Sequence, residues 1–180
     1  MKRNFIRIVF ISICFSLLFT GCKKDDNSGP TNHLNYSGSK HELTKGYLQN
    51  YGEEFSGDVY NFDLILCSSG ITVTEDAGSG VGNFLYFDMY SSSATELTAG
   101  TYTFSTSGSN APSTFDEGEA GINYDIANEI GTRLSFVGGT VVIEKTGNIY
   151  TITIDCALPT AAKVTGYYKG ELIYYDQRGS

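Results

Sequence analysis

The chain has 180 residues, 41% of them hydrophobic, and carries twenty acidic against twelve basic side chains, for a net charge of −8. An acidic surface repels phosphate backbones, so the composition argues against nucleic acid as a partner. After an N-terminal leader, the length allows one domain with one core and is too short for two comfortable domains.

The first 21 residues have the three parts of an export signal. Basic residues stand near the start, an apolar run extends from Ile8 to Phe19, and two small residues precede Cys22. This apolar run is shorter than the roughly 20 residues that a membrane-spanning helix needs. We therefore predict a signal peptide over residues 1–21, with Cys22 as the first residue after cleavage. A secretory signal cut elsewhere and an uncleaved anchor are the alternatives.

Residues 22–39 are predicted to form a flexible tether, because four charged residues follow Cys22 and most of the remainder is polar. Removing residues 1–21 takes away three basic residues and no acid. Nine basic side chains then stand against twenty acidic ones, and the net charge becomes −11. Residues 40–180 are expected to fold as a single β domain.

Apolar residues in this domain alternate at period two, and Tyr, Thr, Val, Ile and Phe are abundant. Both features predict an all-β fold, an antiparallel β-sandwich or flattened barrel of about eight to nine strands with no long helix. Period alone does not separate a sandwich from a closed barrel. The predicted strands run near His41–Tyr51, Val59–Ser68, Asn83–Ser91, Thr101–Ser105, Thr132–Val137, Thr140–Lys145, Ile149–Cys156 and Lys163–Tyr175, with a ninth near Ile71–Thr74.

Side-chain parity predicts which strand faces are buried, because residues two apart share a face and the more apolar face packs inward. The expected core residues are Phe62, Leu64, Leu66, Leu85, Phe87, Tyr150, Ile152 and Ile154. The last arm, residues 163–175, has large side chains on both faces and glycines at Gly166 and Gly170. This pattern indicates a bent strand that serves two sheets.

The polar face of the 83–91 strand supplies the candidate ligand-binding residues. Tyr86, Asp88 and Tyr90 alternate with apolar neighbours, so all three side chains should leave the same face. An aromatic ring beside a carboxylate can stack on a sugar ring and accept hydrogen bonds from its hydroxyls. The alternative is that the tyrosines cover a second sheet or a half-exposed rim.

Two cysteines remain in the predicted domain, Cys67 and Cys156. Parity places Cys67 on the strand face opposite Leu66, whereas Cys156 shares a face with Ile154, which argues against a disulfide. Export permits one, and a bulge could reverse either side. A disulfide and two buried thiols both stay open.

Catalytic and metal sites find little support in the sequence. His41 is the single histidine of the predicted domain, no Gly-x-Ser-x-Gly elbow accompanies it, and no closely spaced His or Cys residues suit zinc. The stretch Asp116-Glu117-Gly118-Glu119 is expected to be a glycine-containing loop, which either is solvated or holds calcium without the spacing of an EF-hand. We predict no catalytic residue, no metal site and no cofactor.

The segment Phe19-Thr20-Gly21-Cys22 resembles the bacterial lipobox, whose cysteine receives a diacylglyceryl group. The following Cys-Lys-Lys-Asp-Asp resembles the start of lipoproteins of Bacteroidetes-type bacteria, where it signals display on the outer face of the outer membrane. With the pattern Leu97-Thr98-Ala99-Gly100-Thr101-Tyr102-Thr103-Phe104, the chain is similar to the small, uncharacterised β-rich lipoproteins of these bacteria. The resemblance implies lipidation at Cys22 and transfers no functional residue.

The sequence thus predicts a non-enzymatic, surface-exposed outer-membrane lipoprotein that contacts the membrane through its lipid anchor and binds an extracellular glycan or protein. Retention on the inner leaflet of the outer membrane is the alternative to surface display. A structural or assembly component of a surface complex or pilus is the first alternative function. The second is an inhibitor of a host hydrolase such as lysozyme, which the acidic charge would favour against a basic target.

Overall fold

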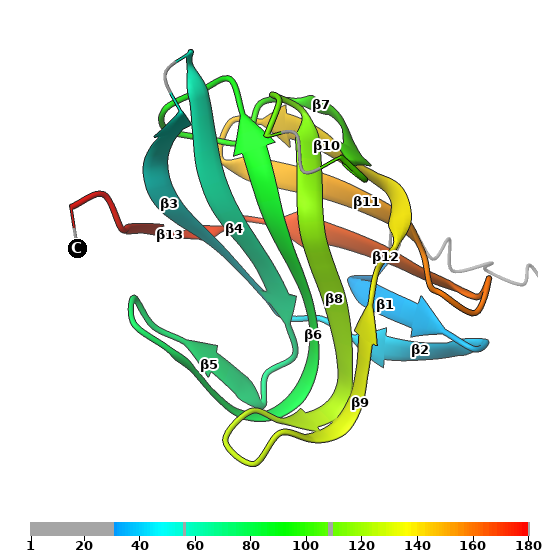
Figure 1. Cartoon of the computed structure of the whole chain (residues 1–180). Helices are drawn as coiled ribbons and strands as arrows, with labels where there is room; N and C mark the ends of the chain where they lie inside the picture. The colour runs from blue at the N-terminus through cyan, green and yellow to red at the C-terminus, as the bar shows by residue number, and fades with distance from the viewer. Residues whose placement is uncertain (1–30, 56, 108–109, 180) are drawn as a thin grey trace, which may run out of the picture.

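The computed structural model describes residues 31–55, 57–107 and 110–179. Within them the chain forms thirteen strands and no helix (Figure 1). The strands are β1 His33–Tyr36, β2 Ser39–Glu42, β3 Lys45–Phe55, β4 Val59–Cys67, β5 Ile71–Val73, β6 Gly78–Ser91, β7 Gly100–Phe104, β8 Thr114–Asp125, β9 Ile130–Ser135, β10 Gly138–Thr146, β11 Ile149–Ala157, β12 Lys163–Gly170 and β13 Ile173–Asp176. Among these residues there is no helix with the length and apolar character to cross a membrane.

The strands join into one mixed sheet that curls on itself. The order is β13-β3-β4-β6-β8-β7-β10-β11-β12-β1-β2, with β5 paired to β6 and β9 paired to β8. In Figure 1 the layer of β3, β4, β6 and β8 stands in front of the layer of β10, β11 and β12. The all-β prediction is therefore confirmed. The predicted number of eight to nine strands was too low. The purely antiparallel arrangement was also wrong, because β7 pairs with β8 and β13 pairs with β3 in parallel.

The main core lies between the two layers. All eight predicted core side chains, including Phe62, Phe87 and Ile152, are at most 5% exposed, which confirms the parity argument. Phe87 touches the rings of Phe115 and Phe136, with centroids 5.5 and 5.6 Å away. The same core cluster includes Ile152 of β11 and Val164 of β12, so the main core joins the two layers.

The folded body begins before the expected boundary at residue 40. Strand β1 pairs with β12 and β2, and Leu34 is fully buried in the main core. Residues 33–39 therefore belong to the body and were wrongly placed in the tether. No periodic signal marks this segment, because Leu34 and Tyr36 are the large apolar side chains of β1 and β2 and the other residues are polar. The burial of β1 depends on its pairing with β12, about 130 residues later in the chain.

The last arm was predicted as one bent strand that serves two sheets, and it forms two separate strands of a single sheet instead. It breaks between β12 and β13 at Glu171 and Leu172, after Gly170. Strand β12 lies between β11 and β1, whereas β13 extends the other end of the sheet beside β3. In Figure 1 this arm crosses behind the front layer and ends at the far left. The arm thus connects the part of the sheet around β11 and β1 with the opposite edge, which β13 forms.

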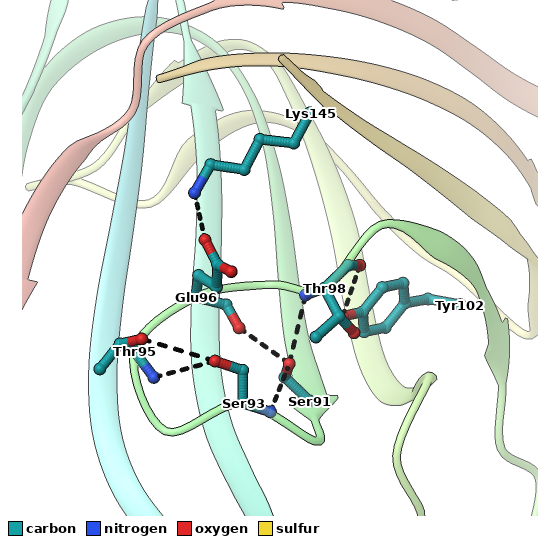
Figure 2. Close-up of polar contacts among 7 residues, drawn as sticks. All are labelled: Ser91, Ser93, Thr95, Glu96, Thr98, Tyr102 and Lys145. Carbon is teal, nitrogen blue, oxygen red and sulfur yellow. Dashed lines mark hydrogen bonds and ion pairs between the residues drawn. The ribbon is translucent and has the colours of Figure 1, made fainter. Parts of the chain in front are cut away.

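The connection between β6 and β7 covers one end of the main core with a set of polar contacts (Figure 2). The hydroxyl of Ser91 donates to the Glu96 carbonyl at 2.8 Å, and the carboxylate of Glu96 pairs with Lys145 of β10. Tyr102 is fully buried, and its hydroxyl donates to the Thr98 carbonyl at 3.2 Å. The Leu-Thr-Ala-Gly-Thr-Tyr pattern thus forms the end of this connection and the start of β7.

The lower ends of β6 and β8 bend away from the rest of the sheet, as Figure 1 shows. Register shifts occur between Gly82 and Phe84 in the β6–β8 pair and between Ile122 and Asp125 in the β8–β9 pair. Such bulges bend a strand and increase its twist. The bent part, residues 71–82 with residues 123–131, is called the shelf here.

Candidate functional site: a hollow beneath the shelf

The shelf lies over the face of β3, β4, β6 and β8 that is turned away from the main core, which is called the outer face here. A second apolar cluster fills the space between them, with Tyr47, Cys67, Ile71, Val73, Phe84 and Tyr124 as its buried members. The ring of Phe84 meets Tyr124 edge to face at 5.8 Å. Gly121 is required beneath that ring, because a Cβ there would overlap it.

Side chains from the edge of the sheet hold the shelf in place by donating to its backbone. Lys45 Nζ donates to the Ile71 carbonyl at 2.8 Å, and Gln49 Nε2 donates to the Thr74 carbonyl at 3.1 Å. The hydroxyl of Tyr175 on β13 donates to the Val73 carbonyl at 3.2 Å. The shelf is therefore positioned from β3 and β13 as well as from its own strands.

A hollow of about 300 Å³ remains between the shelf and the outer face. Apolar and aromatic side chains form much of its wall, namely Ile65, Ile71, Val73, Phe84, Tyr124 and Ile126, with Tyr51 and Tyr86. Gln49 and the charged residues Glu75, Asp76, Glu119, Glu129 and Arg133 also line it. Ligand sites are typically concave and mostly apolar with a few polar groups, and their volumes start at about 300 Å³.

The three residues predicted for ligand binding leave one face of β6, as parity requires, and that face is the outer one. Only Tyr86 lines the hollow. Tyr90 is 4% exposed, and its hydroxyl donates to Asp116 on β8 at 3.3 Å. The expectation of an exposed Tyr90 ring was wrong, because a polar neighbour on a strand that the sequence did not predict takes up its hydroxyl.

One carboxylate joins the two tyrosines of the hollow. Asp63 on β4 accepts a hydrogen bond from the Tyr86 hydroxyl at 3.0 Å and another from the Tyr51 hydroxyl at 3.1 Å. Burial raises the pKa of Asp63, while the two hydroxyl donors oppose that rise. Burial is the largest cause that raises the pKa of both phenols, and the charge of Asp63 is the second. The pKa of Tyr51 is raised to about 12, and that of the more deeply buried Tyr86 is raised more strongly. Both phenols are therefore neutral donors near neutral pH.

A row of carboxylates crosses the outer face next to this pair of tyrosines. In the strand register Asp63 of β4 stands opposite Asp88 of β6, which stands opposite Glu117 of β8. Like charges directly opposite each other destabilise a sheet. Burial is the main reason that the pKa of Asp88 is raised to about 7, and the neighbouring acids Asp63, Asp116 and Glu117 raise it further. The Asn61 amide donates a hydrogen bond to the Asp88 carboxylate and opposes this rise. Asp88 thus holds a proton more strongly than an ordinary aspartate.

The charged groups around the hollow are mostly acidic. Arg133 Nε donates to Glu119 at 2.5 Å, so these two charges compensate each other. In the described ranges no ion pair involves Glu75, Asp76 or Glu129, all of which are exposed. The hollow therefore has an excess of negative charge at its rim.

The acidic stretch at residues 116–119 lies within strand β8, not in a loop. The calcium-loop expectation was wrong on this point, because the acidic residues alternate with Gly118 and the buried Ala120, which face the core. In the part of the chain that the structure describes, no group of three or more His, Cys, Asp or Glu side chains could hold a metal ion. His41 lies on β2, the end strand of the sheet order, and is not among the residues that line the hollow.

The cysteines follow their predicted faces. Cys67 lies in the outer cluster and Cys156 in the main core, and both are free thiols. Burial raises the pKa of Cys67 to about 11 and that of Cys156 to about 12. Both side chains are therefore protonated packing groups, which resolves the open question of a disulfide.

Sequence reasoning missed most of the residues that line the hollow. Tyr51 and Asp63 lie on predicted strands and share the parity of the outer face, so a register of β3 against β4 would have found them. Tyr124 lies on β8, and Arg133 lies on β9, which pairs with β8. The positions of both residues therefore depend on a strand that was not predicted. Cys22 and the segment 1–21 lie outside the described residues.

Comparisons with protein-family models, with curated proteins and with solved structures found no match for this chain.

Proposed function

We propose that this chain is a surface-exposed outer-membrane lipoprotein, without enzymatic activity, whose β domain captures an extracellular ligand in the hollow beneath the shelf, and that this ligand is a glycan. The observation that carries the proposal is the hollow itself. It combines aromatic walls with convergent polar groups on a rigid sheet, which is the usual composition of a small-ligand site.

The aromatic side chains favour a sugar among the ligand classes. Tyr51 is 45% exposed and lines the hollow together with the half-buried Tyr86, so aromatic surface is accessible there. The apolar face of a sugar ring stacks on such a ring, while its hydroxyls bond to carboxylates and amides. A volume of about 300 Å³ is suited to one sugar unit or a short fragment.

A glycan array followed by calorimetric titration tests the proposal, with the lipidated chain purified in detergent. Tyr51→Ala should weaken binding about tenfold, since losing about 1.4 kcal/mol changes an equilibrium constant by that factor. Tyr51→Phe keeps the ring and should retain most of the affinity. Tyr167→Ala, on a half-buried tyrosine of β12, is the control and should bind normally.

Three outcomes would argue against the proposed glycan site or favour another function. Unchanged affinity in Tyr51→Ala would remove the hollow as the glycan site. Recovery of a defined surface complex from cross-linked outer membranes, with no glycan bound on the array, would favour the assembly component. Inhibition of lysozyme by the purified chain would favour the inhibitor.

The lipid anchor is tested by Cys22→Ser, which should abolish labelling by a palmitate analogue and release the body from the membrane fraction. The acyl chains contribute about 0.8 kcal/mol per buried methylene, so their loss should change the distribution completely. Labelling that persists in this variant would contradict the lipoprotein assignment.

Surface display is tested separately by replacing Lys24, Asp25 and Asp26 with alanine. Antibody staining of intact cells should fall while the total amount of lipoprotein stays constant. Equal staining of the variant and the parent would remove this segment as the export signal.

A further inference from the structure

The hollow carries more negative than positive charge. Its lining includes four carboxylates and one guanidinium, and the guanidinium of Arg133 is occupied by Glu119. The remaining acids, Glu75, Asp76 and Glu129, are exposed at the rim, where a ligand could approach them. An anionic ligand would be repelled here, whereas a cationic group would be attracted.

The outer face beyond Tyr86 carries further carboxylates, of which Asp88 has only part of a charge near neutral pH, because burial raises its pKa to about 7. The carboxylate row Asp63, Asp88 and Glu117 runs across the outer face beyond Tyr86, with Asp116 beside it. Clefts lined by charge of one sign with low-dielectric walls focus the field at their opening. The apolar cluster beneath the shelf supplies such a wall on one side of the hollow.

The aromatic rings favour the same type of ligand. A cation within about 6 Å of the face of a Tyr or Phe ring is attracted by the quadrupole of the ring. Tyr51, Phe84, Tyr86 and Tyr124 all line the hollow, and the hydroxyls of Tyr51 and Tyr86 are held by the half-buried Asp63. Asp63 accepts a hydrogen bond from each of the two phenol hydroxyls, which fixes the positions of both rings.

We propose that the group bound in the hollow is a sugar with an unsubstituted, protonated amine. This inference rests on the proposed function and names its ligand class. The sugar ring stacks on Tyr51 and Tyr86, and the ammonium group lies toward the acids of the shelf. An amino sugar satisfies both parts of the lining at once, because one ring face is apolar and the amine is a compact charge with three donors.

The test compares three ligands that share one ring, namely glucose, glucosamine and N-acetylglucosamine, by saturation-transfer NMR and calorimetric titration of the lipidated chain in detergent. Near pH 6.5 the amine is protonated, since an α-amino group has a pKa of about 7.7 to 8.0. Glucosamine should bind about tenfold more tightly than either neutral sugar, since it alone adds the attraction of a cation to acids and rings. Its affinity should fall as salt is raised, while that of glucose stays constant.

Charge-neutralising variants locate the effect. Glu75→Gln, Asp76→Asn and Glu129→Gln should each reduce the preference for glucosamine, and the triple variant should remove it. Glu144→Gln is the matched control, because it removes one exposed carboxylate from β10, outside the hollow. These exposed substitutions should leave thermal unfolding unchanged, so a loss of preference reflects the ligand and not the fold.

The outcomes separate this inference from the proposed function. If the three sugars bind equally and Tyr51→Ala weakens them all, the glycan site stands and the amine preference is overturned. If no sugar binds but a lysine-containing peptide does, with the same dependence on the three acids, the ligand is a basic protein segment and both proposals fall. A preference for glucosamine that survives in the triple variant would also overturn the inference.

Discussion

The two apolar clusters of this molecule lie on opposite faces of the same strands and are closed in different ways. The main core is covered by a complete second layer of sheet, and its large side chains are fully buried. The outer cluster is covered only by the shelf, and a hollow with half-buried tyrosines and exposed acids remains beside it. One sheet thus has one face that is completely covered and one face that keeps an open hollow.

The largest effect should come from Phe87→Ala in the main core. The side chain is fully buried among the rings of Phe115 and Phe136, so its removal should cost about 3 to 5 kcal/mol of unfolding free energy. Denaturant unfolding measures this loss. Glycan affinity in the fraction that stays folded should not change, and a loss below about 1 kcal/mol would mean that the core was assigned wrongly.

A smaller loss of stability with a larger loss of binding is expected for Phe84→Ala in the outer cluster. Phe84 is 8% exposed and lines the hollow, where the opening allows the site to relax after truncation. We expect about 2 kcal/mol of destabilisation and a clear drop in glycan affinity. Denaturant unfolding and calorimetric titration of the same preparation give both values. Equal profiles for Phe84→Ala and Phe87→Ala would contradict the division of roles between the two faces.

The third prediction concerns pH and the carboxylate row. Because the pKa of Asp88 in the fold is about 7, above the ordinary value of 3.8, the folded state keeps a proton that the unfolded chain releases. Stability should therefore be fully present at acidic pH and fall as pH rises toward and through 7. Asp88 faces Asp63 on β4 and Asp116 and Glu117 on β8, and all three acids raise its pKa. The hydrogen bond from Asn61 lowers it.

Asp88→Asn should remove most of this dependence, because the amide oxygen still accepts from Asn61 and no charge develops. We expect the variant to be more stable than the parent by about 1 kcal/mol at pH 8, with a smaller difference at pH 5. Thermal unfolding across this pH range is the measurement. A parent protein that gains stability as pH rises from 5 to 8 would contradict the raised pKa of Asp88.

The smallest effect is expected at the edge of the main core, in the ion pair between Glu96 and Lys145. Their side chains are 41% and 27% exposed, so Glu96→Gln should cost at most about 1 kcal/mol. The loss should shrink in high salt, which screens exposed charges. A cost above about 2 kcal/mol would show that this pair, and not the sheet layers, closes that end of the core.

The sequence was sufficient for the main core and insufficient for the candidate site. Alternation identifies the buried face of β4, β6 and β11, because each of these strands has one clearly apolar face. It fails for β8, where the outward acids give the appearance of a solvated loop, and for β1, whose burial comes from β12. The hollow depends on the bulges at Gly82 and Ile122, and no periodic pattern encodes the direction in which a bulge bends a strand.

The position of β12 between β11 and β1 has a consequence for the order in which the molecule can assemble. Strand β1 emerges first during synthesis, yet the strand that buries Leu34 follows it by about 130 residues. Pairings so distant in sequence form slowly, because a long loop must close before they contribute any stability. The sheet is therefore incomplete until its last strands are available, and the β1–β2 hairpin has no partner in the rest of the sheet before β12 has been made.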